Sequence, residues 1–191
     1  MNRYELTLGR RSAALKQVSR ATAGFTLLEL MVTMAIMTVF LTSALPSFGS
    51  MVKNNRLEAE QMDFMSSIAL ARSEAAKRGV PVSLSAMTPV TTGNEFGNGW
   101  VVWVDNNNDG VYQPETETIR VHQALSSDIR LASATTEMTF QPSGFRRYQD
   151  DSGNLIEAQF TVCDSRHNVK GAQVTVLPSG SINLNKQYMC Q

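Results

Sequence analysis

The chain has 191 residues, of which 42% are hydrophobic, and it contains 17 basic and 17 acidic residues. This length is enough for one domain of ordinary size together with an anchoring segment, and it argues against a second independent domain. The formal net charge of zero excludes a general electrostatic attraction to nucleic acid, so any such binding has to come from a local basic patch.

An apolar run from Phe25 to Leu45 dominates the N-terminal part of the chain. It has 21 residues, of which only Glu29 is charged, and it follows a segment with five basic residues and one acidic residue. As a helix, this run would be roughly 30 Å long, the thickness of membrane hydrocarbon. The basic segment before it predicts that the N-terminus stays in the cytoplasm and that the chain after Pro46 lies outside.

Glu29 is the residue of this run that needs an explanation. A carboxylate that faces lipid costs on the order of 2.5 to 3.5 kcal/mol, so it calls for a partner. Cleavage after Gly24 would free the α-amino group of Phe25, and this cation would pair with Glu29 of a neighbouring, staggered helix. Glycine suits such a cut because it leaves room for a peptidase beside an extended backbone.

The stretch Gly24-Phe25-Thr26-Leu27-Leu28-Glu29-Leu30 resembles the prepilin peptidase site of type IV pilins and type II secretion pseudopilins. The resemblance implies that residues 1–24 are a leader and that prepilin peptidase cuts after Gly24 and methylates Phe25. It also implies that Glu29 supports docking into the growing fibre. Removal of the leader leaves 12 basic and 16 acidic residues, a net charge of minus four.

Two other interpretations of the apolar run are an ordinary secretory signal and a plain membrane anchor. A secretory signal has an apolar segment of about 7 to 15 residues. This run is longer, carries an acid near its start and offers only Thr42-Ser43-Ala44 as a weak cleavage site. A plain membrane anchor requires neither Glu29 nor Gly24.

Helical spacing continues after the apolar run. Pro46 removes one backbone donor and should kink the helix without ending it. Between residues 47 and 79, apolar residues recur at helical steps, which predicts an amphipathic helix that ends near Gly79. We expect residues 25–46 to lie in the membrane or the fibre core and residues 47–79 to pack on a globular head. The apolar helix residues are Leu57, Phe64, Ile68, Ala71 and Ala75.

From residue 80 onward the apolar pattern alternates, and Gly, Asn, Asp and Pro residues separate the alternating segments. This predicts an α+β head, in which residues 80–191 form one domain with residues 47–79 and an antiparallel sheet packs on the helix. Trp100 and Trp103 are interpreted as core residues, and His122 as a surface residue of its strand. The predicted strands are 80–86, 100–104, 118–123, 138–140, 158–163, 173–177 and 181–184.

Two cysteines, Cys163 and Cys190, lie in the part of the chain expected to be exported. In an oxidising compartment, such a pair most simply forms one disulfide. This bond would close a loop of roughly 28 residues and contribute about 3 kcal/mol. The absence of a C-x-x-C motif and of clustered histidines in the sequence argues against a redox or metal role.

Beyond the cleavage site, the sequence contains in order Asn55-Arg56-Leu57, the segments 70–75, 99–105 and 160–164, and a C-terminal cysteine. In this order, these segments resemble the FimT/FimU/GspH group of minor pilins and pseudopilins. The resemblance implies a low-abundance minor pilin that helps to start or cap a type IV pilus, with a minor pseudopilin of a type II secretion system as the alternative. Its partners would be the peptidase, the major and other minor pilins or pseudopilins, and the inner-membrane assembly platform. The chain would lie in the inner membrane with a periplasmic head, and after assembly in the fibre.

The segment 105–110 has the oxygen donors and the glycine of the first half of an EF-hand loop. Asp105, Asn107 and Asp109 are therefore candidate calcium ligands, although the acid expected at the end of such a loop falls on Thr116. A hairpin connection is the alternative, because Asn, Asp and Gly tolerate left-handed conformations. We otherwise expect no cofactor.

DNA capture is a further candidate function. Some FimT-like minor pilins take up DNA through a Gly-Arg-x-Arg pattern, but the corresponding turn reads Gly180-Ser181-Ile182-Asn183, without arginine. The alternative is a solvated surface. The candidate phosphate contacts for DNA are Arg146, Arg147, Arg166, Lys170 and Lys186.

Catalysis has no support, since neither His122 nor His167 accompanies a nucleophile motif.

Overall fold

The computed structural model describes residues 24–107, 109–147, 156–166 and 168–190, without the side chains of residues 43–47. The chain divides into two compact units, Met1–Leu45 and Pro46–Gln191. Of the predicted leader, residues 1–24, only Gly24 belongs to the described residues.

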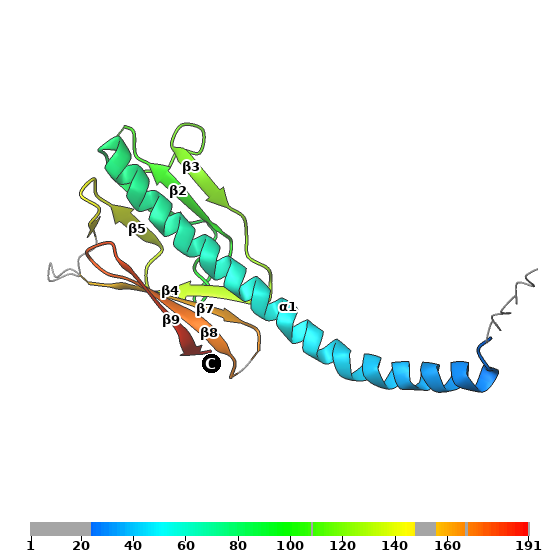
Figure 1. Cartoon of the computed structure of the whole chain (residues 1–191). Helices are drawn as coiled ribbons and strands as arrows, with labels where there is room; N and C mark the ends of the chain where they lie inside the picture. The colour runs from blue at the N-terminus through cyan, green and yellow to red at the C-terminus, as the bar shows by residue number, and fades with distance from the viewer. Residues whose placement is uncertain (1–23, 108, 148–155, 167, 191) are drawn as a thin grey trace, which may run out of the picture. The chain divides into compact units, whose positions relative to one another are not determined.

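Helix α1 spans Leu27–Arg78 (Figure 1). It continues through Pro46 as predicted, whereas the expected kink at this residue stays a prediction. The helix ends near Gly79, which adopts a left-handed φ of 71° and donates its N–H to the carbonyl group of Ala75 at 3.0 Å. This is a glycine cap of the kind that commonly closes helices.

The described part of the head contains antiparallel strands in two sheets, ordered β3-β2-β1-β5-β6 and β4-β7-β8-β9 (Figure 1). The predicted α+β head with antiparallel strands is therefore confirmed, but the strands form two sheets where one was expected. Alternation in the sequence predicts which face of a strand is buried, but it does not specify the strand's neighbours. The strands are β1 Val82–Ala86, β2 Trp100–Val104, β3 Thr118–His122, β4 Ile129–Ser133, β5 Glu137–Phe140, β6 Arg146–Arg147, β7 Ala158–Asp164, β8 Lys170–Val176 and β9 Ile182–Met189.

Strands β4 and β6 lie outside the segments predicted from the sequence. Strand β4 pairs with β7 in a register that runs from Ile129 opposite Asp164 to Ser133 opposite Phe160. Only its first three residues alternate clearly between buried and exposed, and β6 has two residues. Both patterns are too short for a period of two to be recognised.

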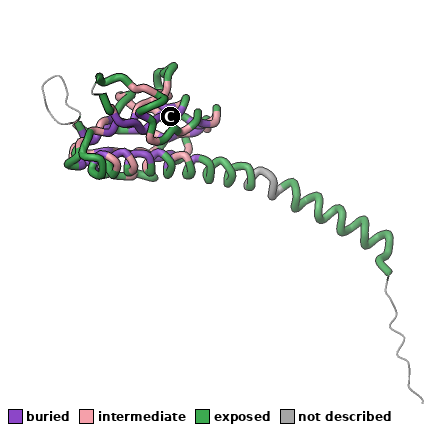
Figure 2. The backbone as a smooth tube through the Cα atoms, turned by 90° about the horizontal axis from the view of Figure 1, so that it is seen from above, coloured by how far each residue is buried: buried purple, intermediate pink, exposed green. Residues whose placement is uncertain are grey.

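The core of the head contains residues of α1 and of strands from both sheets, and buried positions follow the helix and the strands beside it (Figure 2). Phe64 contacts Phe96, Trp100 and Phe160 at ring-centroid distances of 5.4, 5.1 and 4.8 Å. Because Trp100 lies in β2 and Phe160 in β7, one helix residue joins both sheets. All the predicted core residues are buried: Leu57, Phe64, Ile68, Ala71, Ala75, Trp100 and Trp103.

His122 is partly buried, so its interpretation as a surface residue is wrong. Its ring stacks on that of Trp100, and only 18% of its side chain is exposed. The reason is that the end of β3 lies against α1, where the Nε2 atom of His122 is 3.5 Å from the carboxylate of Glu60. Burial raises the pKa of Glu60, and His122 offsets part of this rise.

The predicted disulfide between Cys163 and Cys190 is present. It joins the residue after β9 to β7, and β8 lies between these two strands in the sheet. The bond passes over β8 at Gly171, where a Cβ atom would collide with the Sγ atom of Cys190 and the carbonyl oxygen of Val162. The disulfide therefore requires glycine at this position.

Candidate functional site

The predicted cleavage site lies immediately before α1. Residues Gly24, Phe25 and Thr26 are not helical and are exposed. Apart from Gly24 itself and its chain neighbours, no described residue comes within 4 Å of the position that a Cβ on Gly24 would take. The peptide bond between Gly24 and Phe25 is therefore accessible in non-helical backbone, which is what a peptidase requires.

Thr26 caps the N-terminus of α1. Its Oγ1 atom accepts the N–H of Glu29 at 3.1 Å, the hydrogen bond that an N-cap residue makes to the third helical residue. The segment Thr26-Leu27-Leu28-Glu29 has the spacing of a capping box, and an acid in the first turn also interacts favourably with the helix dipole. Glu29 therefore stabilises the start of the helix through its place in the first turn, in addition to its predicted docking role.

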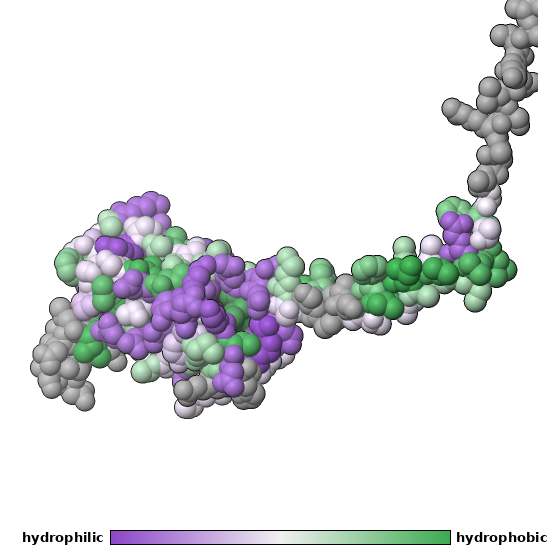
Figure 3. All heavy atoms as spheres, turned by 60° about the horizontal axis from the view of Figure 1, so that its bottom comes forward, coloured by the Kyte–Doolittle hydropathy of each residue, from purple (hydrophilic) through white to green (hydrophobic). Residues whose placement is uncertain are grey.

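Large apolar side chains cover the first part of α1 on all sides. Those between Phe25 and Leu41 are 48% to 78% exposed, and they line this segment in the space-filling view (Figure 3). They occupy consecutive positions, such as 30–32 and 39–41, and so do not form a single stripe. A helix that is apolar all round is typical of a lipid environment or the interior of a helical assembly.

Glu29 differs from the other polar residues of this segment. The hydroxyl groups of Thr33, Thr38 and Thr42 donate to carbonyl groups three or four residues earlier, at 2.8 to 2.9 Å. Such internal hydrogen bonds satisfy hydroxyl groups where water is absent. The carboxylate of Glu29 has no bonding partner among the described residues, and only its backbone N–H makes a hydrogen bond, to Thr26.

Among the described residues, no helix combines the length and the apolar character needed to cross a membrane. The predicted membrane segment, 25–46, includes residues 43–46, whose side chains lie outside the described part of the chain.

The candidate calcium loop connects β2 to β3. The carboxylate of Asp105 accepts the backbone N–H groups of Asp109 at 3.2 Å and Gly110 at 2.9 Å. Asp109 in turn accepts the N–H of Val111 at 2.8 Å, and its other oxygen accepts the side-chain amide of Asn107 at 2.8 Å. These bonds are those of the turn that was the alternative interpretation, and calcium binding by Asp105, Asn107 and Asp109 stays a prediction.

Glu117 holds this loop closed, a role that was not predicted from the sequence. Glu117 is 1% exposed, and its carboxylate accepts the backbone N–H groups of Asn106 at 3.0 Å and Gln113 at 2.9 Å. The loop therefore folds around a buried acid next to Thr116, the position at which the EF-hand pattern fails.

The five candidate phosphate contacts do not form one surface. Arg146 is 2% exposed and donates to the carbonyl group of Ile156, which argues against its contact with DNA. Arg147 is exposed at the end of β6. The remaining three line a hollow of about 410 Å³ beside α1; they are Arg166, Lys170 and Lys186.

Acidic residues offset two of the charges in this hollow. The Nζ atom of Lys186 lies 2.6 Å from Glu58. Arg166 donates its Nε to Asp164 at 2.6 Å and an Nη to Asn54 of α1 at 2.7 Å. Burial alone would raise the pKa of Asp164, but the hydrogen bonds and the charge of Arg166 hold it below its usual range. Arg166 therefore links β7 to the helix.

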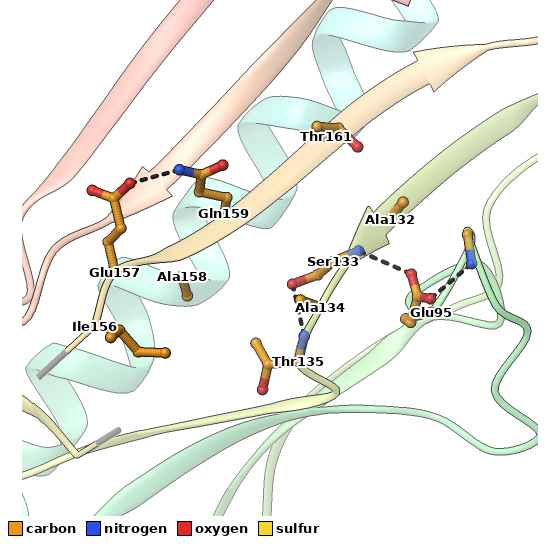
Figure 4. Close-up of a pocket in the computed structure, with 11 residues that line it drawn as sticks. Glu95, Ala132, Ser133, Ala134, Thr135, Ile156, Glu157, Ala158, Gln159 and Thr161 are labelled. Atoms are coloured by element: carbon orange, nitrogen blue, oxygen red, sulfur yellow. Dashed lines mark hydrogen bonds between the residues drawn. The ribbon is translucent and has the colours of Figure 1, made fainter. Parts of the chain in front are cut away.

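A second hollow, of about 440 Å³, lies beside β4 and β7 and is lined by residues that include Glu95, Thr135 and Gln159 (Figure 4). Glu95 points toward β4 and accepts the N–H groups of Ser133 at 2.9 Å and Gly93 at 2.7 Å. Burial by itself would raise the pKa of Glu95, but these two N–H groups hold it below its usual range. The acid thus covers part of the free edge of β4 and protects it from pairing with another strand.

Two family models match this chain, one over the head and one over the start of the helix. Residues 60–180 match the family described as Type II transport protein GspH, and residues 19–45 match the prokaryotic N-terminal methylation motif. No curated protein sequence gives a significant match.

Two crystal structures of the type IV minor pilin FimU from Pseudomonas aeruginosa, strain PAO1, resemble this chain. The first has a TM-score of 0.55 and 18% identity, and the match covers 73% of this chain and 96% of FimU. The second has a TM-score of 0.49 and 20% identity, covering 70% and 94%. The first of these structures shares its fold with this chain, an N-terminal helix packed on antiparallel sheets.

The family match covers more than half of the chain. The methylation motif includes Gly24, Phe25 and Glu29, the residues that form the accessible bond and the unpaired acid. This family and this fold are those of structural pilins. The chain therefore belongs to the GspH family of type IV minor pilins and pseudopilins.

Proposed function

We propose that this chain is a minor pilin of a type IV pilus, which contributes to starting and assembling the fibre. One observation carries the proposal. Glu29 is the single polar side chain of residues 27–42 without a partner among the described residues, and it follows an exposed, non-helical Gly24-Phe25 bond.

Cleavage of that bond by prepilin peptidase would create the partner that Glu29 lacks. The α-amino group of Phe25 is then a cation, and methylation of this amine preserves its charge. In an apolar environment either charge alone costs several kcal/mol, so pairing the amine of one subunit with Glu29 of the next stabilises both. The same pair fixes the stagger between neighbouring helices.

Before assembly, the apolar helix would hold the chain in the inner membrane with its head in the periplasm. Three features support this location: the apolar surface of residues 25–41, the basic residues of 1–24 on its cytoplasmic side, and a disulfide that suits an oxidising compartment. The partners would be prepilin peptidase, the assembly platform, and the major and other minor pilins.

A minor pseudopilin of a type II secretion system is the second candidate, because the matched family is described as Type II transport protein GspH. Both machines use the same cleavage and the same charge pair. The geometry of residues 24–42 therefore fits either fibre.

DNA capture at the hollow lined by Arg166, Lys170 and Lys186 is the third candidate. Because Asp164 and Glu58 offset two of these charges, we expect weak binding that falls steeply with salt. A labelled duplex titrated at low salt tests this, and an unmeasurable shift would end the idea.

The experiment that tests the proposed function is a deletion of this chain, scored in parallel for surface fibres, exoprotein secretion and DNA uptake. Loss of fibres supports the minor pilin. Loss of secretion with fibres retained identifies the pseudopilin, and loss of DNA uptake with fibres retained identifies the capture module. Mass spectrometry of the native protein should find methylated Phe25 as the first residue, and any other first residue contradicts the cleavage site.

A further inference from the structure

Three side chains with metal-ligating atoms converge where α1 meets β3, in the head. Glu60 and Asp63 lie about one turn apart on α1, and His122 is the last residue of β3. The Nε2 atom of His122 is 3.5 Å from Oε2 of Glu60 and 3.7 Å from Oδ2 of Asp63. One ligand atom from each residue lies within 4.8 Å of the other two.

The ring of His122 is held in a fixed orientation. Its Nδ1 atom lies 2.9 Å from the carbonyl oxygen of Gln123, and because a carbonyl group only accepts, Nδ1 carries the proton. The ring stacks on Trp100 with centroids 3.8 Å apart and planes 2° from parallel. Gly99 permits this packing, since a Cβ atom there would collide with the backbone of His122 and Gln123. Histidines that bind metals commonly have one nitrogen fixed in this way.

The oxygen of Glu60 that faces this ring is itself unsatisfied. Oε2 is shielded from solvent, and no donor among the described residues makes a hydrogen bond to it. A shielded carboxylate oxygen without a donor is destabilising. When Nε2 of His122 is unprotonated, its lone pair and two carboxylates face one another, and a positive charge is needed between them.

We propose that Glu60, Asp63 and His122 bind a divalent cation of the zinc type. Around a tetrahedral ion with bonds of about 2 Å, neighbouring ligand atoms lie about 3.3 Å apart, which is close to the separations of 3.5 and 3.7 Å. One imidazole nitrogen with two carboxylates suits zinc or a similar transition ion, whereas calcium takes six to eight oxygen ligands.

The position of the cluster determines how an ion reaches it and which elements the bound ion would join. About half of the side chain of Asp63 is exposed, at 51%, so an ion can enter from solvent and keep water as its fourth ligand. The bound ion would join α1 to the edge strand β3. The site could not be predicted from the sequence, because the first two strands separate Glu60 and Asp63 from His122 along the chain.

The test uses the processed full chain in detergent, without an affinity tag and stripped of metal by a chelator. Zinc chloride is titrated by calorimetry, and thermal unfolding is followed in parallel. We expect one saturable site and a rise in melting temperature that EDTA reverses. Glu60→Gln should weaken zinc binding at least tenfold. His122→Phe should do the same while keeping an aromatic ring against Trp100.

Matched controls separate this site from adventitious zinc binding. The chain has two histidines, so His167→Gln removes the other one. Glu58→Gln removes an acid of the same helix that pairs with Lys186 instead. Both variants should bind zinc as the wild type does. If Glu60→Gln or His122→Phe fails to fold, Asp63→Asn changes a half-exposed side chain and should still weaken binding. No saturable binding by the wild type, or equal affinity in the ligand variants, overturns the proposal.

Discussion

Phe64 of α1 and Trp100 of β2 meet edge to face, with ring centroids 5.1 Å apart and planes at 87°. Both side chains are fully buried, and such pairs contribute about 0.5 to 1.5 kcal/mol beyond the area that they bury. Phe64 also contacts Phe160 of the other sheet. The position is therefore where the helix and both sheets come together.

Phe64→Ala should lower the free energy of unfolding by about 3 to 5 kcal/mol, because the cavity would open between all three layers. Met62→Ala is the matched control, since Met62 lies on the same helix and is 55% exposed; its effect should stay within about 0.5 kcal/mol. Denaturant unfolding followed by tryptophan fluorescence measures both. Similar effects of the two substitutions would contradict the packing described for Phe64.

The position of Phe64 was predictable because its spacing to Leu57, Ile68 and Ala71 repeats with the period of a helix. The two tryptophans were predictable for a similar reason, since β2 is a continuous apolar run. These are local properties, and a local pattern is enough to assign a buried face.

Residues whose environment depends on distant segments were not predictable. Arg146 looks like a surface base in the sequence, yet it is buried beside Ile156. His122 alternates outward on its strand, but Trp100 and Glu60 cover it. In both cases the tertiary neighbours, not the strand pattern, decide the exposure.

The capping role of Thr26, in contrast, can be predicted from its spacing to Glu29, because an N-cap is a local interaction.

Removal of the disulfide should destabilise the head. Cys190→Ser frees the end of β9 and should lower the free energy of unfolding by about 2 to 4 kcal/mol. Gly171→Ala should also be destabilising with both cysteines present, because its Cβ would meet Cys190 and Val162. Thermal unfolding with and without reductant checks this: reductant should lower the melting temperature of the wild type and leave that of Cys190→Ser unchanged. An unchanged wild-type melting temperature would contradict the prediction.

Asp164 should make the stability of the head depend on pH. Its pKa in the folded protein lies below the ordinary value of 3.8, so its ionised form stabilises the fold above about pH 4. This contribution is lost as the pH falls through the lowered pKa. Asp164→Asn should therefore cost about 1 to 3 kcal/mol at pH 7, and the difference from the wild type should shrink below about pH 4. Denaturant unfolding at pH 7 and pH 3 measures it.

Glu115→Gln is the control for this pH dependence, since Glu115 is an exposed acid of the β2–β3 connection. It should follow the wild-type profile at both pH values. A constant difference between Asp164→Asn and the wild type across this range would mean that the ionisation of Asp164 does not stabilise the fold.

Gly24→Ala should slow cleavage, because a side chain would enter the space that a peptidase needs beside the backbone. The full-length precursor should accumulate, as measured by the ratio of precursor to mature bands. Thr26→Ala is the control, since it weakens the helix cap by about 0.5 to 2 kcal/mol without changing the bond that is cut. A mature-sized product of Gly24→Ala at the wild-type rate would count against this cleavage site.

Glu29 has two roles that one substitution separates. Glu29→Gln keeps a residue suited to the third position of a capping box but removes the charge that would pair with Phe25. If the charge pair drives docking, export and cleavage should be normal while incorporation into fibres falls at least tenfold, as a cost of about 2.5 to 3.5 kcal/mol for an unpaired charge requires. Glu29→Ala should be no worse in incorporation, although it also weakens the cap. Quantifying the subunit in sheared fibres decides between the roles: normal incorporation of Glu29→Gln together with failure of Glu29→Ala would assign the acid to the cap and remove the basis of the register proposed here.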